Sequence, residues 1–139
     1  MAYAQWGTFV IRAMNFDVTI KDILVSWGKL YDSEQTGSEG GDKDKEYSPK
    51  NIEGTVIKSG SSFAINACGR SDSASGTTGS FKLYDGDTLV GTYSWDCPWG
   101  SKTNSSTWLD SDPGYITQQS GANLDSGALG TVQLKTVKV

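Results

Sequence analysis

Short stretches in which apolar and polar residues alternate run through the whole chain, and no other feature of the sequence constrains the fold as strongly. A period of two places every second side chain on one face, as in a strand with one buried face. No stretch has the spacing of an amphipathic helix, and glycine- and serine-rich turns separate the alternating stretches. These stretches cover residues 8–13, 18–21, 23–27, 63–67, 88–95 and 130–139. The pattern predicts an all-β fold, a single-domain antiparallel β-sandwich that spans residues 1–139.

Three local signals refine this prediction. The alternation changes phase near Asp22, as it does at a β-bulge. Asp85-Gly86 is a strong signal for a two-residue hairpin turn. Asp112-Pro113-Gly114 marks a further turn before the next strand.

Composition and charge exclude several classes of function. The chain of 139 residues has 12 basic and 16 acidic side chains, which argues against a nucleic-acid partner because such proteins present a basic face. It has no histidine, so Ser-His-Asp catalysis and imidazole-based zinc sites are excluded. We therefore expect no enzyme, no metal and no cofactor. A glycosidase built on two carboxylates is a distant alternative, with Asp110 and Asp112 or Asp96 and Asp125 as its pairs.

The sequence also predicts where the protein is made and where it acts. It has neither the basic and apolar regions of a secretory signal nor an apolar run of the ~18 residues that span a membrane. We expect a soluble protein that is made in the cytoplasm, released, and active at the outer surface of target-cell membranes.

Two cysteines and one polar segment are assigned structural roles. Cys68 and Cys97 are expected to be free, buried thiols, because no secretory signal places them in an oxidising compartment. The segment from Asp32 to Glu46 is polar and glycine-rich, and it is predicted to be an exposed, mobile loop. Its alternating carboxylates resemble a calcium loop, but the interleaved lysines and Tyr47 argue against that reading.

The segment from Trp95 to Lys102 contains two tryptophans, a proline, a glycine and a lysine. Indole faces attract ammonium groups and a lysine attracts phosphate, so the segment suits a pocket for a zwitterionic head group. Judged from this stretch alone, the favoured interpretation is that its tryptophans are buried in a β-sheet core. A second loop, from Gly69 to Gly79, holds Arg70 and Asp72, either as a loop-ordering ion pair or as ligands for phosphate and ammonium.

Several motifs together resemble one known family, the aegerolysins, which are small acidic β-sandwich proteins of fungi and bacteria. The resemblance runs nearly end to end, and its opening block is very specific. The matching blocks are residues 2–6 (AYAQW), 26–30 (SWGKL), 41–44 (GDKD), 66–72 (NACGRSD), 76–79 (GTTG), 95–104 (WDCPWGSKTN) and 123–130 (NLDSGALG).

The resemblance implies binding to sphingolipids with small head groups, such as ceramide phosphoethanolamine or sphingomyelin in sterol-rich membrane. It also implies a perforin-like partner that makes the pore of a two-component cytolytic (hemolytic) or insecticidal toxin. Trp27, Trp99 and Lys102 are expected at the head-group site, and Trp6 and Trp95 near the membrane-facing surface.

Asp72 is a weaker candidate for the same lipid-binding site. Ser75 replaces the Glu of fungal members, so lipid and sterol preference is expected to differ here. The loop from Asp32 to Gly41 is longer than expected for the family, which suggests a partner contact. A lectin-like carbohydrate-binding module, with exposed aromatic rings stacked on sugars, is the alternative function.

Overall fold

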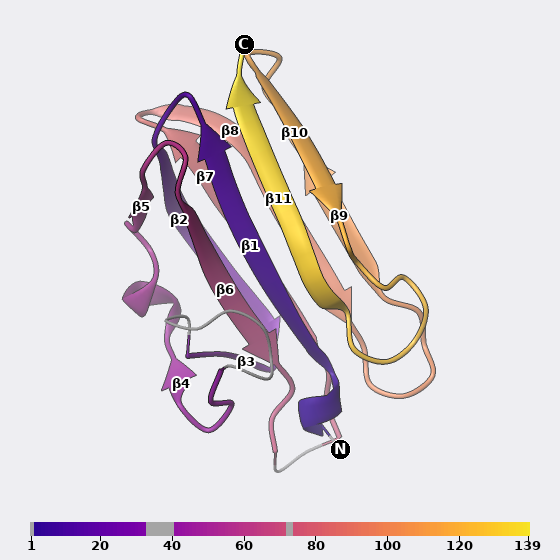
Figure 1. Ribbon diagram of the computed structural model, residues 1–139. Helices are drawn as coiled ribbons and strands as arrows, with labels where there is room; N and C mark the ends of the chain where they lie inside the picture. Colours follow the sequence, from indigo (N-terminus) through magenta and orange to yellow (C-terminus); the bar gives the residue numbers. More distant parts are fainter. Residues whose placement is uncertain (1, 33–40, 72–73) are drawn as a thin grey trace.

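The alternating stretches form strands that lie in two layers of sheet (Figure 1), and the apolar side chains of both layers form one core between them. The computed structural model describes residues 2–32, 41–71 and 74–139. Its elements in chain order are η1 (Ala2–Ala4), β1 (Trp6–Met14), β2 (Val18–Trp27), β3 (Lys29–Tyr31), β4 (Glu46–Tyr47), η2 (Pro49–Asn51), β5 (Val56–Ile57), β6 (Ser62–Cys68), β7 (Thr77–Asp85), β8 (Thr88–Cys97), β9 (Ser105–Leu109), β10 (Tyr115–Ser120) and β11 (Gly130–Lys138).

The two layers differ in strand order. The six-stranded sheet has the order β10-β11-β1-β6-β3-β4, and the five-stranded sheet has the order β5-β2-β7-β8-β9. The predicted β-sandwich class is confirmed, with one difference: β1 and β11 are parallel. All other strand pairs in the described residues are antiparallel. Since β1 and β11 lie at opposite ends of the sequence, no short turn forces them to run in opposite directions.

The predicted bulge and hairpin are both present. Asp22 has a φ of 52°, and the register between β2 and β7 shifts between Lys21 and Leu24. In the β7–β8 hairpin, Asp85 pairs with Thr88, so the two-residue turn is Gly86-Asp87, one residue later than the sequence signal suggested. Gly86 has a φ of 58°, a conformation that glycine adopts without steric cost.

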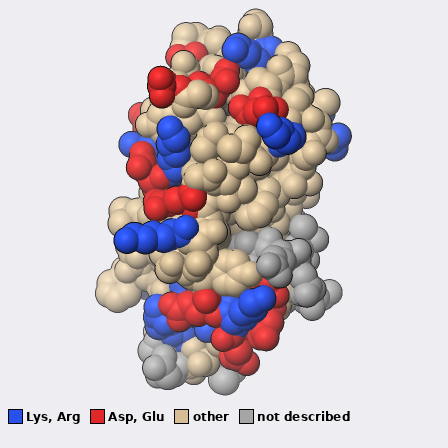
Figure 2. All heavy atoms as spheres, turned by 90° about the vertical axis from the view of Figure 1, so that its left-hand side faces the viewer, with Lys and Arg blue, Asp and Glu red and all other residues tan. Residues whose placement is uncertain are grey.

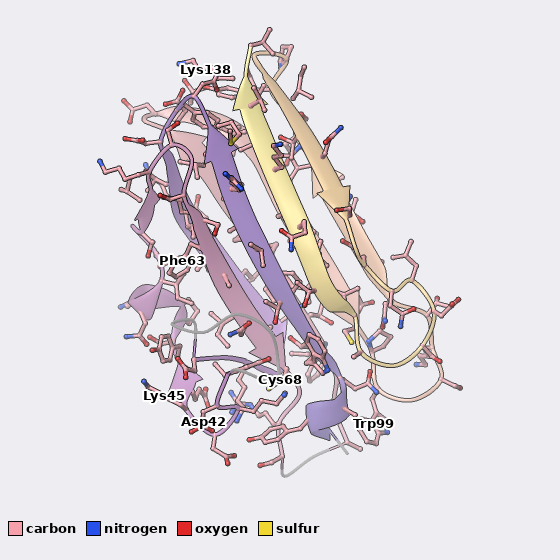
Figure 3. All side chains as sticks on the ribbon, viewed as in Figure 1. Asp42, Lys45, Phe63, Cys68, Trp99 and Lys138 are labelled. Carbon is pink, nitrogen blue, oxygen red and sulfur yellow. The ribbon has the colours of Figure 1, made fainter. Side chains whose placement is uncertain are left out.

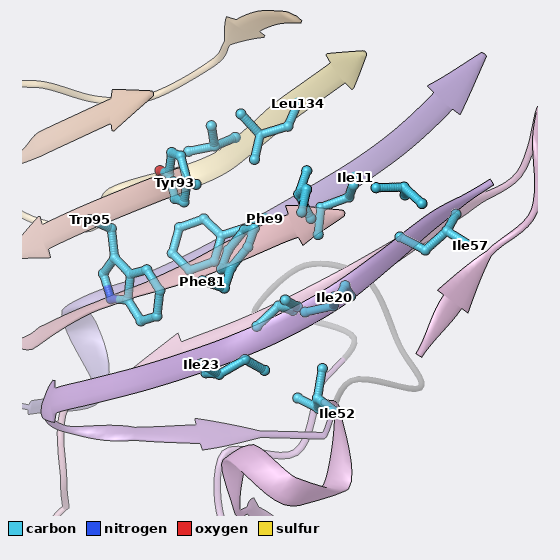
Figure 4. Packing of buried hydrophobic residues seen from close by; sticks show 14 of the residues in the cluster. Phe9, Ile11, Ile20, Ile23, Ile52, Ile57, Phe81, Tyr93, Trp95 and Leu134 are labelled. Carbon is cyan, nitrogen blue, oxygen red and sulfur yellow. The ribbon is translucent and has the colours of Figure 1, made fainter. Parts of the chain in front are cut away.

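Aromatic rings fill the middle of the sandwich (Figure 4). Phe9 of β1 lies 5.1 Å from the Tyr93 ring and 4.7 Å from the Trp95 ring, both on β8. The Phe81 ring of β7 lies 5.3 Å from that of Tyr93. Tilted pairs at these distances are favourable beyond the burial of their area. The core thus runs from one sheet to the other through aromatic side chains in mutual contact.

Both cysteines are free and buried, as predicted. Burial raises the pKa of each thiol to about 11, so both are uncharged at neutral pH. The predicted exposed loop is confirmed at Asp42 and at residues 44–46, but Asp32 is buried. Gly41 and Lys43 are half-buried, and residues 33–40, with most of the expected partner contact, lie outside the described residues.

Candidate functional site

An open pocket of about 410 Å³ lies where the ends of β2 and β8 meet the start of β7. It is at the end of the sandwich where β1 begins, as the position of Trp99 shows, and Lys138 marks the opposite end (Figure 3). The lining residues are Trp27, Ala74, Ser75, Gly76, Thr78, Asp96, Pro98 and Trp99.

Strand register determines which side chains reach this pocket. Thr78 of β7 is paired with Trp27 of β2 on one side and with Asp96 of β8 on the other. The next residues along, Thr77 and Cys97, are fully buried. Because neighbouring residues in a strand face opposite ways, Thr78 and Asp96 lie on the outer face of the five-stranded sheet.

A glycine lets the two loops of the pocket approach closely. A Cβ atom on Gly76 would collide with the carbonyl oxygen of Cys97 and with the backbone of Pro98. The backbone at Gly76 is therefore packed directly against Cys97 and Pro98, and the neighbouring residues Ser75 and Trp99 line the same pocket.

The pocket combines aromatic faces with one carboxylate. The side chain of Trp27 is 67% exposed and that of Trp99 is 37% exposed, and neither belongs to the core. Asp96 is half-buried, and its Oδ1 accepts a hydrogen bond of 2.8 Å from the Thr78 hydroxyl. Indole faces and a carboxylate both attract cations, so the arrangement suits a small positively charged group.

The sequence-predicted site residues do not all lie in this pocket. Trp27, Ser75 and Trp99 line this pocket together. Lys102 is exposed in the loop that follows Trp99, but it is not among the lining residues. Asp72 lies outside the described residues.

The expectation that Trp95 lies near a membrane-facing surface is wrong. Its side chain is 1% exposed, packs on Phe9, and donates a hydrogen bond of 3.1 Å from Nε1 to the Thr77 hydroxyl. Trp95 faces the core from β8, and the next residue, Asp96, faces outward from the same strand. The core interpretation of tryptophan in this segment holds for Trp95 and fails for Trp99.

Trp6 lies beside a network of lysines and tyrosines that holds η1 in place. The Lys43 ammonium lies 5.9 Å from the Trp6 ring centroid, and Trp6 is half-buried. Lys29 Nζ donates to the Tyr3 hydroxyl at 2.7 Å, and that hydroxyl donates to Asp44 Oδ1 at 2.7 Å. The network therefore connects η1 to β3 and to the turn before β4.

Arg70 is paired with Glu46 across the same end of the molecule. Its guanidinium donates to both carboxylate oxygens of Glu46, at 3.0 and 3.2 Å, and these hydrogen bonds lower the pKa of that carboxyl. The suggested Arg70–Asp72 pair stays a prediction, because Asp72 is not described. Figure 2 shows basic and acidic side chains intermixed on the face it presents, with no large patch of one sign.

Sequence reasoning missed Thr78 as a site residue and named Asp96 only as half of a glycosidase pair. Both residues lie at outward-facing positions of their strands, Thr78 on β7 and Asp96 on β8. The sequence does not show that they are neighbours, because that depends on the register between the two strands. In the described residues, no group of His, Cys, Asp or Glu side chains is arranged to hold a metal ion. No helix in the described part of the chain is long and apolar enough to cross a membrane.

The chain is similar to known proteins over almost its entire length. The family description "Aegerolysin" matches residues 4–139. Ostreolysin A6 of Pleurotus ostreatus is 49% identical over 99% of this chain and 98% of its own, and Asp-hemolysin of Aspergillus fumigatus is 41% identical over 96% and 93%.

Solved structures agree with these sequence matches. The crystal structure of IP-1A from Alcaligenes faecalis has a TM-score of 0.87 and 41% identity, covering 99% of this chain and 93% of that one. The RahU protein, crystallised in complex with a Tris molecule, has a TM-score of 0.90 and 33% identity, covering 99% of this chain and 98% of its own. The sequence and the fold together show that the chain belongs to the aegerolysin family.

Proposed function

We propose that this protein binds membrane lipids through the pocket between Trp27 and Trp99 and recognises the head group of a sphingolipid. The observation that carries the proposal is the pairing of two exposed indoles with a carboxylate in one pocket, next to the loop that holds Lys102. The ligands are ceramide phosphoethanolamine or sphingomyelin in sterol-containing membrane.

The chemistry of a zwitterionic head group fits this end of the molecule. The ammonium group lies between the indole faces, where cation–π attraction is strongest for tryptophan. The phosphate group is met by Lys102, an exposed cation in the adjacent loop. Tryptophan side chains also favour the membrane–water interface, so Trp27 and Trp99 add affinity for the bilayer itself.

The relatives support a membrane-directed function. Two of them carry the names ostreolysin and hemolysin. The RahU crystal structure contains Tris, a hydroxyl-bearing primary ammonium at neutral pH. A protein of this fold has therefore been crystallised with a small amine-bearing molecule.

We assign docking to this chain and perforation to a perforin-like partner, as in a two-component cytolytic or insecticidal toxin. The apolar faces of both sheets are used in a common core, which includes Phe9, Phe81 and Leu134. Exposing these side chains to lipid would dismantle the sandwich, whereas docking through the pocket leaves it intact.

Vesicle co-sedimentation tests the binding proposal. We expect retention on vesicles that contain sphingolipid and sterol, and none on vesicles of glycerophospholipid alone. Trp27→Ala and Lys102→Ala are each expected to weaken binding about tenfold, since a cation–π contact or a charged hydrogen bond is worth roughly 1–2 kcal/mol.

Lys50→Ala is the matched control for the loss of a lysine, because Lys50 is exposed on η2, outside the pocket lining. Failure of every sphingolipid vesicle to retain the wild-type protein would refute lipid docking. A positive glycan array together with negative vesicles would favour the lectin-like alternative. The partner is tested separately, by asking whether dye leaks from vesicles only when a perforin-like protein from the same source is added.

A further inference from the structure

Asp96 is the one ionisable side chain among the residues that line the pocket in the described part of the chain. It lies in a row of outward side chains that crosses four strands, from Trp27 of β2 through Thr78 and Asp96 to Ser105 of β9. Its place on a paired strand, and not on a loop, fixes the position of its carboxylate relative to Trp27.

Asp96 has no basic partner in the described residues. The ion pairs in this part of the chain join Lys58 to Asp17, Arg70 to Glu46 and Lys138 to Asp85. The hydrogen bond from Thr78 uses one acceptor position of the Asp96 carboxylate, and a carboxylate offers about four. The side chain is therefore held in place by Thr78 and still has the capacity to accept hydrogen bonds from a ligand.

We propose that Asp96 accepts a hydrogen bond from a primary ammonium group and so makes the pocket select phosphoethanolamine over phosphocholine head groups. This inference rests on the proposed function, because it assigns a role within the same pocket. A primary ammonium has N–H groups to donate, whereas the quaternary ammonium of choline has none. Both cations interact with the Trp27 and Trp99 indoles, so the hydrogen bond to Asp96 accounts for the difference in affinity between the two head groups.

The substitution Asp96→Asn tests this role. An amide keeps the size of the side chain and an oxygen that still accepts from Thr78, but it removes the charge. Binding to vesicles with ceramide phosphoethanolamine is expected to weaken about tenfold, the lower end for a hydrogen bond between charged partners. Binding to vesicles with sphingomyelin, at equal sterol and carrier lipid, is expected to change less than about twofold, so the variant loses its preference.

Asp87→Asn is the matched control, because it makes the same change of charge in the turn at the other end of the β7–β8 hairpin. It is expected to bind both lipids like the wild type. Thr78→Val is expected to reduce the preference as well, and Thr78→Ser to keep it, because only the hydroxyl holds the carboxylate. Thermal unfolding of each variant checks that the fold is retained.

Soluble head groups separate the pocket from the membrane. Phosphoethanolamine and phosphocholine are titrated without lipid, and the indole N–H signals of Trp27 and Trp99 are followed by NMR. The wild type is expected to bind phosphoethanolamine about tenfold more tightly, and Asp96→Asn to bind the two equally.

The possible failures are distinct. If the wild type binds no sphingolipid vesicle, the proposed function fails, and the soluble titration still decides whether Asp96 selects a primary ammonium. If the wild type binds both lipids but prefers sphingomyelin, or if Asp96→Asn weakens both equally, the role of Asp96 is wrong and lipid docking stands.

Discussion

Trp95 and Trp27 carry the same side chain and have opposite roles in this protein. Trp95 is 1% exposed and packs on Phe9 in the middle of the sandwich, whereas Trp27 is 67% exposed at the pocket. Trp95 also has a partner for its indole N–H, the hydroxyl of Thr77. Context, and not residue type, decides which tryptophan supports the fold and which one is available to a ligand.

The two tryptophans are therefore expected to respond differently to truncation. Trp95→Ala leaves a large cavity and is expected to lower the free energy of unfolding by about 3–5 kcal/mol. Trp27→Ala removes an exposed side chain and is expected to change it by less than about 0.5 kcal/mol. Urea unfolding followed by circular dichroism measures both. Equal losses of stability would show that Trp27 has a structural role after all.

At the scale of elements, one contact joins the ends of three strands from both sheets. Asp85, the last residue of β7, accepts a hydrogen bond of 2.7 Å from the Tyr115 hydroxyl of β10 and one of 2.9 Å from Lys138 Nζ of β11. These two hydrogen bonds hold the pKa of Asp85 below its usual value of 3.8, and the one from Tyr115 has the larger effect. The contact closes the sandwich at the end opposite the pocket.

This contact predicts a dependence of stability on pH. Because the folded-state pKa of Asp85 is lowered, the unfolded chain binds a proton more readily than the folded one. The contribution of Asp85 is complete above pH 3.8 and is lost as the pH falls through its lowered folded-state pKa. Asp85→Asn is expected to cost about 1 kcal/mol at pH 7 and to flatten the acid side of the stability curve. Unfolding midpoints measured between about pH 7 and pH 2 check this, and parallel curves for the variant and the wild type would contradict it.

The sequence predicted individual elements better than their partners. The positions of most strands, the bulge at Asp22 and the β7–β8 turn follow from local alternation and turn chemistry, which depend on neighbours in the chain. The parallel pairing of β1 with β11 does not, because it depends on contacts between the two ends of the sequence. The same limit applies to the candidate site. Trp27 and Trp99 could be named from the sequence because they are tryptophans. Thr78 and Asp96 could not be placed beside them, because that requires the register between neighbouring strands.

For the whole molecule, the pocket and η1 lie at one end and the end of β11 lies at the other (Figures 1 and 3). If the pocket meets a membrane, the long axis of the sandwich stands away from the bilayer. The β7–β8 turn and the exposed Val139 then point toward solvent, where a partner protein has room to attach.

Fusions at the two ends test this orientation. A fluorescent protein placed after Val139 is expected to leave vesicle binding within about twofold of the wild type, because it sits away from the bilayer. The same protein placed ahead of η1 is expected to weaken binding by about tenfold or more through steric exclusion, since roughly 1.4 kcal/mol suffices for that factor. Equal binding by both fusions, with the fold of each confirmed by circular dichroism, would show that the membrane does not meet the η1 end.

The parallel pairing of β11 with β1 also bears on the order in which the six-stranded sheet can assemble. β11 lies between β10 and β1, and it is the only described strand that joins them. Until β11 pairs with β1, the β10 strand has no neighbour in the rest of this sheet. The insertion of β11 therefore attaches β10, and the residues that join the two strands, to the rest of the sandwich.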